Sequence, residues 1–291
     1  MRPERLNLPR IAAVVAVAVL AMASPSCADE PTSGGQPVGA PAPDQPVPRD
    51  PGRNAEELAR ATAGLRDAID AWLADPTARR GRTPEEVTLW ALYQQRIYLF
   101  LTERPRFAAR VVARLNGAIA AEARDILAAR GALKRLTPPT RQRRFRTGKA
   151  LPAETLLRYY RKAQRRFGVA WPVLAAVNFV ETAFNRIRSS STAGAQGPMQ
   201  FIPSTWRAYG MGGDVHDPHD AVLGAANYLR ASGAPRDYRR ALYAYNPSLD
   251  YVNAVLRYVR RIRADRRAYY GFHAWQLFVR TPSGPRRLTG P

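Results

Sequence analysis

Several common features of protein sequences are scarce or missing here. Cys27 is the only cysteine, so the chain cannot form an internal disulfide. The longest apolar run, residues 11–23, has thirteen residues, whereas a helix needs about 20 to cross a bilayer. No internal repeat is apparent, and only three of the 45 basic residues are lysine. These absences exclude a disulfide framework and a repeat architecture, and they make the apolar run too short for a spanning helix.

The N-terminus has the pattern of a secretion signal. Three arginines within the first ten residues precede the apolar run, and small residues follow it. We therefore predict a signal peptide over residues 1–28 and an extracytoplasmic location. Cys27 in "SPSC" allows a lipoprotein signal as an alternative, but Ser24 stands where such signals usually have leucine. We favour simple secretion, with membrane attachment only through the signal or a lipid at Cys27.

Residues 29–53 are rich in proline and glycine and almost free of bulky apolar side chains. Such a composition cannot bury enough surface to fold alone, so a disordered linker is expected. It serves equally well as a tether across a thick wall or as a featureless spacer.

The chain is strongly basic, with a formal charge of +22. Residues 134–149 hold seven basic residues and no acid, and residues 255–291 hold nine arginines and one acid. A basic field concentrates polyanions near the surface. Nucleic acid is the usual partner, but the secretion signal argues against it. Anionic wall polymers or lipid headgroups are the partners available outside a cell, and arginine enrichment through coding bias is the plainer alternative.

Residues 54–149 are predicted to form an accessory helical region. Apolar residues at helical spacing indicate helices over 55–75 and 83–103, and a third over 105–131 that Gly131 would close. This region carries no cluster of catalytic residue types. We expect it to pack on the domain that follows.

Residues 150–267 form the second predicted domain. Helices are expected over 152–168 and 171–185, followed by 35 irregular residues from 186 to 220 that contain one short helix. Such a long irregular stretch inside a helical domain is usually functional. Asp217 fits an N-cap of the next helix and Asp220 its capping box. Residues 268–291 are a tail or a small hairpin around "PSG".

Glu181 is the candidate catalytic residue. It lies in "VNFVETAFN", on a helix that Pro172 would open and that is apolar almost all round. Burial without a cation raises the pKa of a carboxyl group, which is the property of a general acid. The alternative is a solvated surface glutamate, and this stretch alone does not decide between the two.

Three motifs in order resemble one known family. Glu181-Thr182, Ser191 with "GAQGPMQ" at 194–200, and Ala244-Tyr245-Asn246 are similar to the catalytic domain of lytic transglycosylases of the soluble, goose-type-lysozyme-like class. The resemblance covers about residues 150–265. It implies a mainly α, lysozyme-like catalytic domain that cleaves the bond between N-acetylmuramic acid (MurNAc) and N-acetylglucosamine (GlcNAc) in peptidoglycan without water. No metal or organic cofactor is implied. Pro198 departs from the commoner leucine, and the N-terminal helices do not match the superhelical arm of some members.

The resemblance also implies residue roles. Glu181 would act first as acid and then as base, forming a 1,6-anhydromuramyl end. The expected substrate-binding residues are Ser191, Gly194, Met199, Gln200, Tyr245 and Asn246. Among them, Ser191 would bond near Glu181 or the N-acetyl group, and Tyr245 would hold the acetamido oxygen. Gly194, with Gly197, would let the backbone approach the sugar, while Met199 and Gln200 would line the cleft floor.

Two rival functions stay open. Hydrolytic glycosidases normally use two carboxylates, so an aspartate from the 214–220 stretch could position water in a lysozyme. A non-catalytic wall-binding protein would use the basic clusters alone. His216 and His219 beside two aspartates suggest a metal site only weakly, because helix capping explains the aspartates better.

Overall fold

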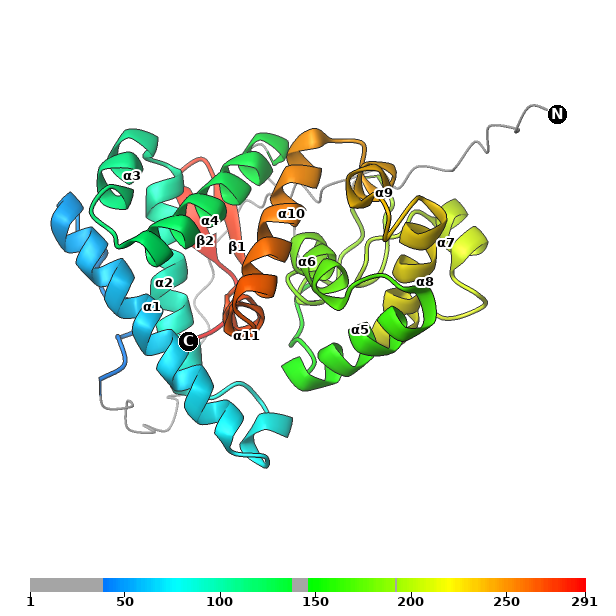
Figure 1. Cartoon of the computed structure of the whole chain (residues 1–291), viewed down its shortest axis with the longest axis horizontal. Coiled ribbons are helices and arrows are strands. Elements are labelled where there is room, and N and C mark those ends of the chain that lie inside the picture. Colours follow the sequence, from blue (N-terminus) through cyan, green and yellow to red (C-terminus); the bar gives the residue numbers. More distant parts are fainter. Residues whose placement is uncertain (1–38, 138–145, 192) are drawn as a thin grey trace, which may run out of the picture.

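The computed structural model describes residues 39–137, 146–191 and 193–291, which are mainly helical with one small hairpin (Figure 1). This confirms the predicted fold class. The predicted signal segment with Cys27, the first ten residues of the predicted linker and residues 138–145 of the basic stretch lie outside the described residues. None of the helices in the described ranges has the length and apolar character needed to cross a membrane.

Within residues 39–137, the structure has four α-helices and one short 3-10 helix. Their bounds are α1 Pro51–Ala74, η1 Ala78–Arg80, α2 Glu85–Thr102, α3 Pro105–Val112 and α4 Gly117–Leu136. The prediction of one helix over 105–131 is wrong, because the Asn116 side chain accepts a hydrogen bond from the Ile119 N–H (3.0 Å) and caps a new helix. Gly131 lies inside α4, which continues for five more residues.

The predicted linker is ordered in its last part. Arg96 on α2 donates to the carbonyl oxygens of Pro43 (3.2 Å) and Gln45 (2.7 Å). The Asn54 amide donates to Pro48 O at 2.8 Å, and α1 begins at Pro51. The expectation of disorder up to residue 53 therefore does not hold for residues 43–53. Side chains on α1 and α2 satisfy carbonyl groups that a proline-rich segment cannot pair with itself.

The second half contains the helices around Glu181. They are α5 Ala153–Phe167, α6 Trp171–Thr182, α7 Pro203–Tyr209, α8 Pro218–Ala231, α9 Tyr238–Tyr245 and α10 Leu249–Ala264. The predicted helix starts at Pro172 and Pro218 are confirmed, and Gly168 ends α5 with a φ of 72°. Helices α5, α8 and α10 pack around α6, which explains why its sequence is apolar on nearly every side.

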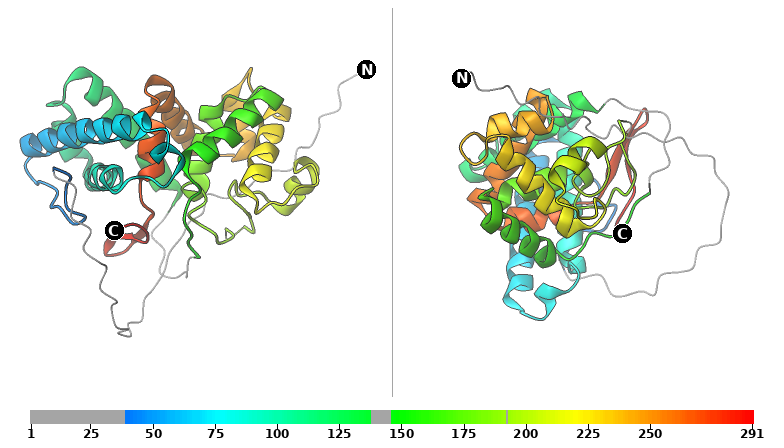
Figure 2. Two further views of the ribbon diagram at one scale, coloured as in Figure 1. Left: turned by 90° about the horizontal axis from the view of Figure 1, so that it is seen from below. Right: turned by 90° about the vertical axis from the view of Figure 1, so that its right-hand side faces the viewer.

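The two halves share one core. Buried side chains from α1 to α11 form a single continuous cluster, and α4 packs along α10. In the left view of Figure 2, α10 and α11 (orange to red) lie between the N-terminal helices and the helices around Glu181. The accessory region therefore supports the very helix that forms one side of the candidate site.

A helix that the sequence analysis did not predict, α11 Arg267–Ala274, follows α10. It lacks a capping side chain and is short, so no pattern marked it, but Tyr269, Tyr270 and Phe272 are buried. The predicted C-terminal hairpin is confirmed as antiparallel strands β1 Phe278–Thr281 and β2 Gly284–Arg287.

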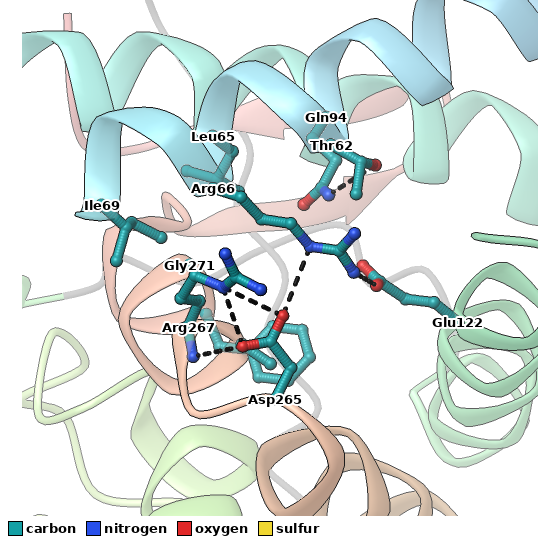
Figure 3. A pocket seen from close by; sticks show the side chains of 11 residues that line it. Thr62, Leu65, Arg66, Ile69, Gln94, Glu122, Asp265, Arg267 and Gly271 are labelled. Atoms are coloured by element: carbon teal, nitrogen blue, oxygen red, sulfur yellow. Dashed lines mark hydrogen bonds and ion pairs between the residues drawn. The ribbon is translucent and has the colours of Figure 1, made fainter. Parts of the chain in front are cut away.

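Two polar contacts attach this C-terminal segment to the N-terminal helices. The Gln95 side chain exchanges two hydrogen bonds of 2.8 Å with the backbone of Gln276. Beside α11, a cavity of about 30 Å³ lies against α1 and α2 (Figure 3). There the Arg66 guanidinium reaches both Glu122 (2.7 Å) and Asp265 (3.3 Å). The charged groups around this cavity pair with each other, so they connect α1 to α4 and to the segment between α10 and α11.

Candidate functional site

Glu181 lies in the last turn of α6 with 3% of its surface exposed. The Tyr251 hydroxyl, from the start of α10, donates a hydrogen bond of 2.7 Å to Glu181 Oε1. Burial raises the pKa of Glu181 to about 8, while the Tyr251 hydrogen bond acts in the opposite direction. Glu181 forms no ion pair with the described residues. It is therefore a carboxyl group that keeps its proton at neutral pH, as a proton donor must.

The polar stripe of α6 fixes the loop that follows it. Pro198 O accepts hydrogen bonds from Asn178 Nδ2 (2.9 Å) and Thr182 Oγ1 (2.7 Å), and Tyr160 donates to Asn178 Oδ1 at 2.6 Å. All three side chains are buried. The "GAQGPMQ" loop is thus attached directly to the helix that carries Glu181.

Helix α6 ends three residues earlier than predicted. Ala183, Phe184 and Asn185 have φ values of 50°, 60° and 66°, a left-handed conformation that non-glycine residues rarely adopt. The Arg186 guanidinium stabilises this end, donating to Ala183 O (3.0 Å) and to His273 O (2.7 Å). Burial lowers the pKa of Arg186 to about 10. Strained backbone of this kind is typical of functional sites, and here it directly follows Glu181.

Ser191 and Gly194 form a tight turn near the start of the loop. Ser191 Oγ accepts from the N–H groups of Ala193 (3.2 Å) and Ala195 (3.0 Å), so the hydroxyl still has a proton to donate. Gly194 has a φ of 80°, and a Cβ added there would meet open space. The predicted approach of the backbone to a ligand is therefore sterically open at Gly194.

Gly197 has a different reason to be glycine. A Cβ there would lie 1.8 Å from Val215 O, so the close packing of two loops excludes any side chain. Gly197 was expected to let the backbone approach a sugar, but its packing against Val215 already explains why no side chain fits there. Gly197 instead fixes the shape of the loop that presents Gln200.

Met199 and Gln200 are both buried, and neither forms an open cleft floor. Met199 has 0% of its surface exposed. Gln200 has 1% exposed and donates through Nε2 to Gly197 O at 2.9 Å, while its Oε1 has no partner among the described residues. A buried acceptor without a partner is costly, so Gln200 Oε1 is a polar group available to a water molecule or a ligand.

Tyr245 is occupied by the protein itself. It is fully buried, and its hydroxyl donates to Met199 O at 2.6 Å. This hydrogen bond holds the "GAQGPMQ" loop, and the expected contact of Tyr245 with an acetamido oxygen stays a prediction. Asn246, 7% exposed, ends α9 and leads into Ser248, whose hydroxyl caps α10. The "AYN" motif thus sets the start of α10.

Tyr251 is the residue that sequence analysis missed. Its ring is stacked on that of Tyr245, with centroids 6.5 Å apart and planes 3° apart, and burial raises its pKa well above the usual value. No family motif pointed to Tyr251. The N-cap at Ser248 was the available signal, since it places Tyr251 in the first turn of α10, facing the motif residues.

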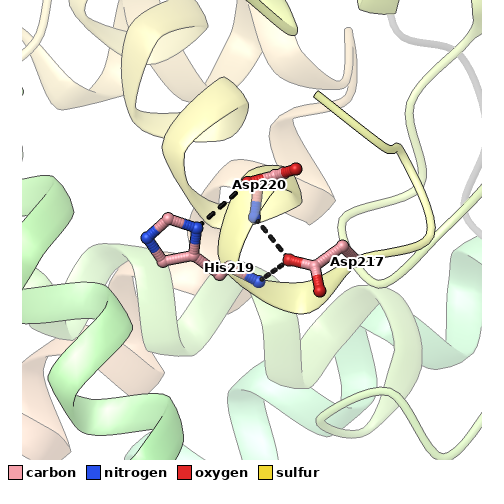
Figure 4. Close-up of side chains that lie close together, drawn as sticks. All are labelled: Asp217, His219 and Asp220. Carbon is pink, nitrogen blue, oxygen red and sulfur yellow. Dashed lines mark hydrogen bonds and ion pairs between the residues drawn. The ribbon is translucent and has the colours of Figure 1, made fainter. Parts of the chain in front are cut away.

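The acids downstream of Glu181 all have local structural partners. Figure 4 shows Asp217 Oδ1 accepting from the N–H groups of His219 (2.8 Å) and Asp220 (3.0 Å). Asp220 accepts from the Asp214 N–H and contacts His219 Nδ1 at 3.0 Å. Asp214 accepts from the His216 N–H. The predicted capping role of Asp217 is confirmed.

The same cluster could be considered for a metal ion, since ligand atoms of Asp217, His219 and Asp220 lie within 4.8 Å of one another. However, Asp217 Oδ1 already caps α8, and Lys162 Nζ lies 2.9 Å from His219 Nε2. A neighbouring ammonium group disfavours a bound cation. Hydrogen bonding within the cluster accounts for its geometry.

Much of the basic C-terminal cluster is used inside the fold. Five of the nine arginines in 255–291 form ion pairs, namely Arg257, Arg260, Arg261, Arg266 and Arg267. Three of them meet the single carboxylate of Asp125 on α4. This part of the positive charge holds helices together, so residues 255–291 offer less free charge than the sequence suggests.

These features define a helical domain in which the buried carboxyl group of Glu181 has a raised pKa, a class of site that suits acid–base chemistry. Residues 158–266 match the family model of the Transglycosylase SLT domain. This segment is therefore similar to that domain, in agreement with the resemblance to lytic transglycosylase catalytic domains. The match supports a transglycosylase-type function on peptidoglycan, and hence extracytoplasmic action on the cell wall. Neither a curated protein nor a solved structure matches the chain.

Proposed function

We propose that this protein is a peptidoglycan lytic transglycosylase that cleaves the MurNAc–GlcNAc bond without water. The observation that carries the proposal is Glu181, a buried carboxyl group with a pKa of about 8 and no carboxylate partner among the described residues. Hydrolytic glycosidases normally use a second carboxylate, about 5–5.5 Å away in retaining enzymes and about 6.5–9.5 Å away in inverting ones. Asp214, Asp217 and Asp220 follow in sequence, but hydrogen bonds to neighbouring groups occupy them.

The chemistry then uses the substrate itself. Glu181 donates its proton to the oxygen that links C1 of MurNAc to GlcNAc, and that bond breaks. The acetamido group of MurNAc stabilises the charge at C1. The 6-hydroxyl of the same sugar attacks C1 and gives its proton to the Glu181 carboxylate. The products are a 1,6-anhydromuramyl end and a free GlcNAc hydroxyl, and Glu181 is regenerated.

The other site residues divide into two groups. Ser191, Gly194, Gln200 and Asn246 are proposed to bind the glycan, since each offers an open backbone position or a polar group near the loop. Met199 and Tyr245 contact each other, so we propose that they position the loop. Tyr251 is proposed to orient Glu181 and to stabilise its ionised form between the two steps.

The product distinguishes this function from its rivals. Purified peptidoglycan is digested in heavy-oxygen water and the fragments are weighed. We expect unlabelled muramyl ends, one water lighter than the reducing sugar and resistant to borohydride. Labelled, reducible ends would instead identify a hydrolase, and cleavage by Glu181→Gln at the wild-type rate would exclude Glu181. Binding without cleavage by the wild-type protein would identify a wall-binding module.

Anionic wall polymers remain proposed partners of the basic stretch 134–149. The test is the salt dependence of wall association after Arg141, Arg143, Arg144 and Arg146 are replaced by glutamine. Binding should weaken at low salt and change little at high salt, because screening removes long-range attraction. Equal loss at both salt concentrations would contradict the electrostatic role.

A further inference from the structure

A large pocket lies beside the helix that carries Glu181. Its volume is about 430 Å³, and it is bounded by α2, α4, the end of α6, α10 and the C-terminal hairpin. Phe179 and Tyr258 supply apolar wall, and Arg130, Lys134 and Arg280 supply positive charge. The accessory region and the hairpin thus build this pocket together with the catalytic domain, and no motif in the sequence indicated it.

The charge of the pocket is unbalanced. Lys134 pairs with Glu103 at 2.6 Å, but neither Arg130 nor Arg280 forms an ion pair with the described residues. Arg130 Nε donates to Thr102 Oγ1 (3.3 Å), and its guanidinium lies 5.7 Å from the Trp275 ring. Arg280 Nη1 donates to two carbonyl oxygens, of Lys134 and Thr137. Each guanidinium keeps further N–H donors, and paired N–H donors match a carboxylate best.

The pocket adjoins the chain segment that carries Glu181. Val180 and Ala183, on either side of Glu181 in the sequence, line it. The Phe179 and Tyr258 ring centroids lie 5.0 Å apart. Two residues further along α6, Glu181 accepts its hydrogen bond from Tyr251, which precedes Tyr258 on α10. Tyr251 and Tyr258 are seven residues apart on α10, which corresponds to about 10 Å. A peptide of four or five residues extends over roughly 13–18 Å.

We infer that this pocket binds the acidic stem peptide attached to the muramyl sugar at the cleavage site. The inference rests on the proposed function for the identity of the substrate. A glycan strand offers hydroxyl and amide groups, whereas a stem peptide combines short alkyl side chains with free carboxylates. The apolar wall of Phe179 and Tyr258 suits the alkyl side chains of the peptide. The guanidiniums of Arg130 and Arg280, which form no ion pair with the described residues, suit its carboxylates.

Direct binding tests the pocket without catalysis. The full chain with Glu181→Gln is titrated calorimetrically with a free stem tetrapeptide at low salt, and then with the same peptide after its carboxyl groups are amidated. We expect amidation to weaken binding about 10-fold or more, because hydrogen bonds to a charged partner are the stronger ones. This comparison leaves the protein unchanged, so it does not depend on the folding of a variant.

A matched pair of variants locates the site. Arg130→Gln removes a pocket cation, and Arg124→Gln removes an exposed arginine of the same helix that lies outside the pocket. Arg130→Gln should weaken peptide binding about 5–10-fold and Arg124→Gln less than 2-fold. On glycan strands, Arg130→Gln should raise KM for peptide-bearing strands and leave KM for peptide-stripped strands unchanged.

The outcomes separate the pocket from the proposed reaction. No binding of the acidic peptide, equal binding of the amidated peptide, or equal effects of the two variants would overturn the pocket assignment while leaving the transglycosylase proposal in place. Peptide binding that follows the expected pattern, combined with hydrolytic products, would retain the pocket and refute the reaction.

Discussion

Asp125 and Glu181 are two buried acids with opposite surroundings. Asp125 on α4 is 5% exposed and Glu181 on α6 is 3% exposed, and both reach a side chain of α10. Asp125 meets three arginines at 2.9–3.4 Å, whereas Glu181 meets the single hydroxyl of Tyr251. Similar burial therefore accompanies an ion-paired carboxylate at Asp125 and a carboxyl group with a raised pKa at Glu181.

The difference shows what distinguishes an acid held in ion pairs from one that is proposed to donate a proton. An ion pair repays the loss of hydration when opposite charges surround the carboxylate. The hydrogen bond from a hydroxyl offsets only part of the lost hydration of a carboxylate, so burial raises the pKa of Glu181. Helix α10 connects the two cases: its C-terminal half is fixed to α4 through Asp125, and its first turn presents Tyr251 to Glu181. The ion pairs between α10 and α4 hold the helix in place, and the same helix positions Tyr251 beside the desolvated carboxyl group of Glu181.

The largest expected effect comes from removing the proton that Glu181 is proposed to donate. Glu181→Gln should lower the rate of peptidoglycan cleavage by about 1,000-fold or more, since an amide cannot donate and recover the proton. The measurement is release of soluble muropeptides from purified walls. Asp125→Asn, measured in parallel below its melting temperature, should retain activity within about 10-fold. Comparable losses of cleavage rate in the two variants would contradict the proposal that Glu181 donates the proton and Asp125 only stabilises the fold.

The same substitution should stabilise the fold at high pH. The folded-state pKa of Glu181 is about 8 and its ordinary value is 4.5, so the folded state binds the proton more tightly. Stability from this group is fully present below pH 4.5 and is lost as the pH rises to about 8. Glu181→Gln should therefore gain on the order of 2–4 kcal/mol relative to wild type between pH 5 and pH 8. Urea unfolding at both pH values measures this, and a constant difference would contradict the raised pKa.

Neutralising the other acid should have the opposite sign. Asp125→Asn leaves Arg261, whose side chain is 16% exposed, without its counter-charge. We expect a loss of about 2–3 kcal/mol, less than for a fully enclosed pair because Arg260 is 58% exposed. Urea unfolding at pH 7 is the measurement, with Asp70→Asn as control, since that acid is 56% exposed in its pair with Arg267. The control should change stability by less than about 1 kcal/mol.

The smallest effect concerns the hydroxyl that orients Glu181. Tyr251→Phe should lower kcat about 10–100-fold, corresponding to the loss of one hydrogen bond to a charged group. It should also move the alkaline decline of activity, which follows deprotonation of Glu181 near pH 8, to higher pH, because the Tyr251 bond lowers that pKa. The control Tyr98→Phe removes a buried hydroxyl that has no partner among the described residues. An unshifted pH profile in Tyr251→Phe would show that the Tyr251 hydroxyl does not influence the pKa of Glu181.

Local patterns predicted most elements correctly. Proline at the first turn and glycine at the end placed α5, α6 and α8, and the capping aspartate of α8 was found from its spacing. The errors lie where local signals were weak or misleading. Asn116 split one predicted helix into α3 and α4, and α11 has no cap at all. Proline-rich residues 43–50 became ordered through carbonyl contacts with helices distant in sequence, which composition does not reveal.

The sequence by itself determined the class of domain and the identity of the buried acid, because one carboxylate in an apolar helix and three ordered motifs need no coordinates to be recognised. Only the tertiary structure decided what surrounds that acid. Tyr251, 70 residues away in sequence, supplies its hydrogen bond, and Tyr245 donates a hydrogen bond to Met199 O. The pocket with Arg130 and Arg280 also exists only in the fold, since its walls come from five separate elements. Periodicity reports which face of a helix is buried, but the partner on that face depends on packing between distant segments.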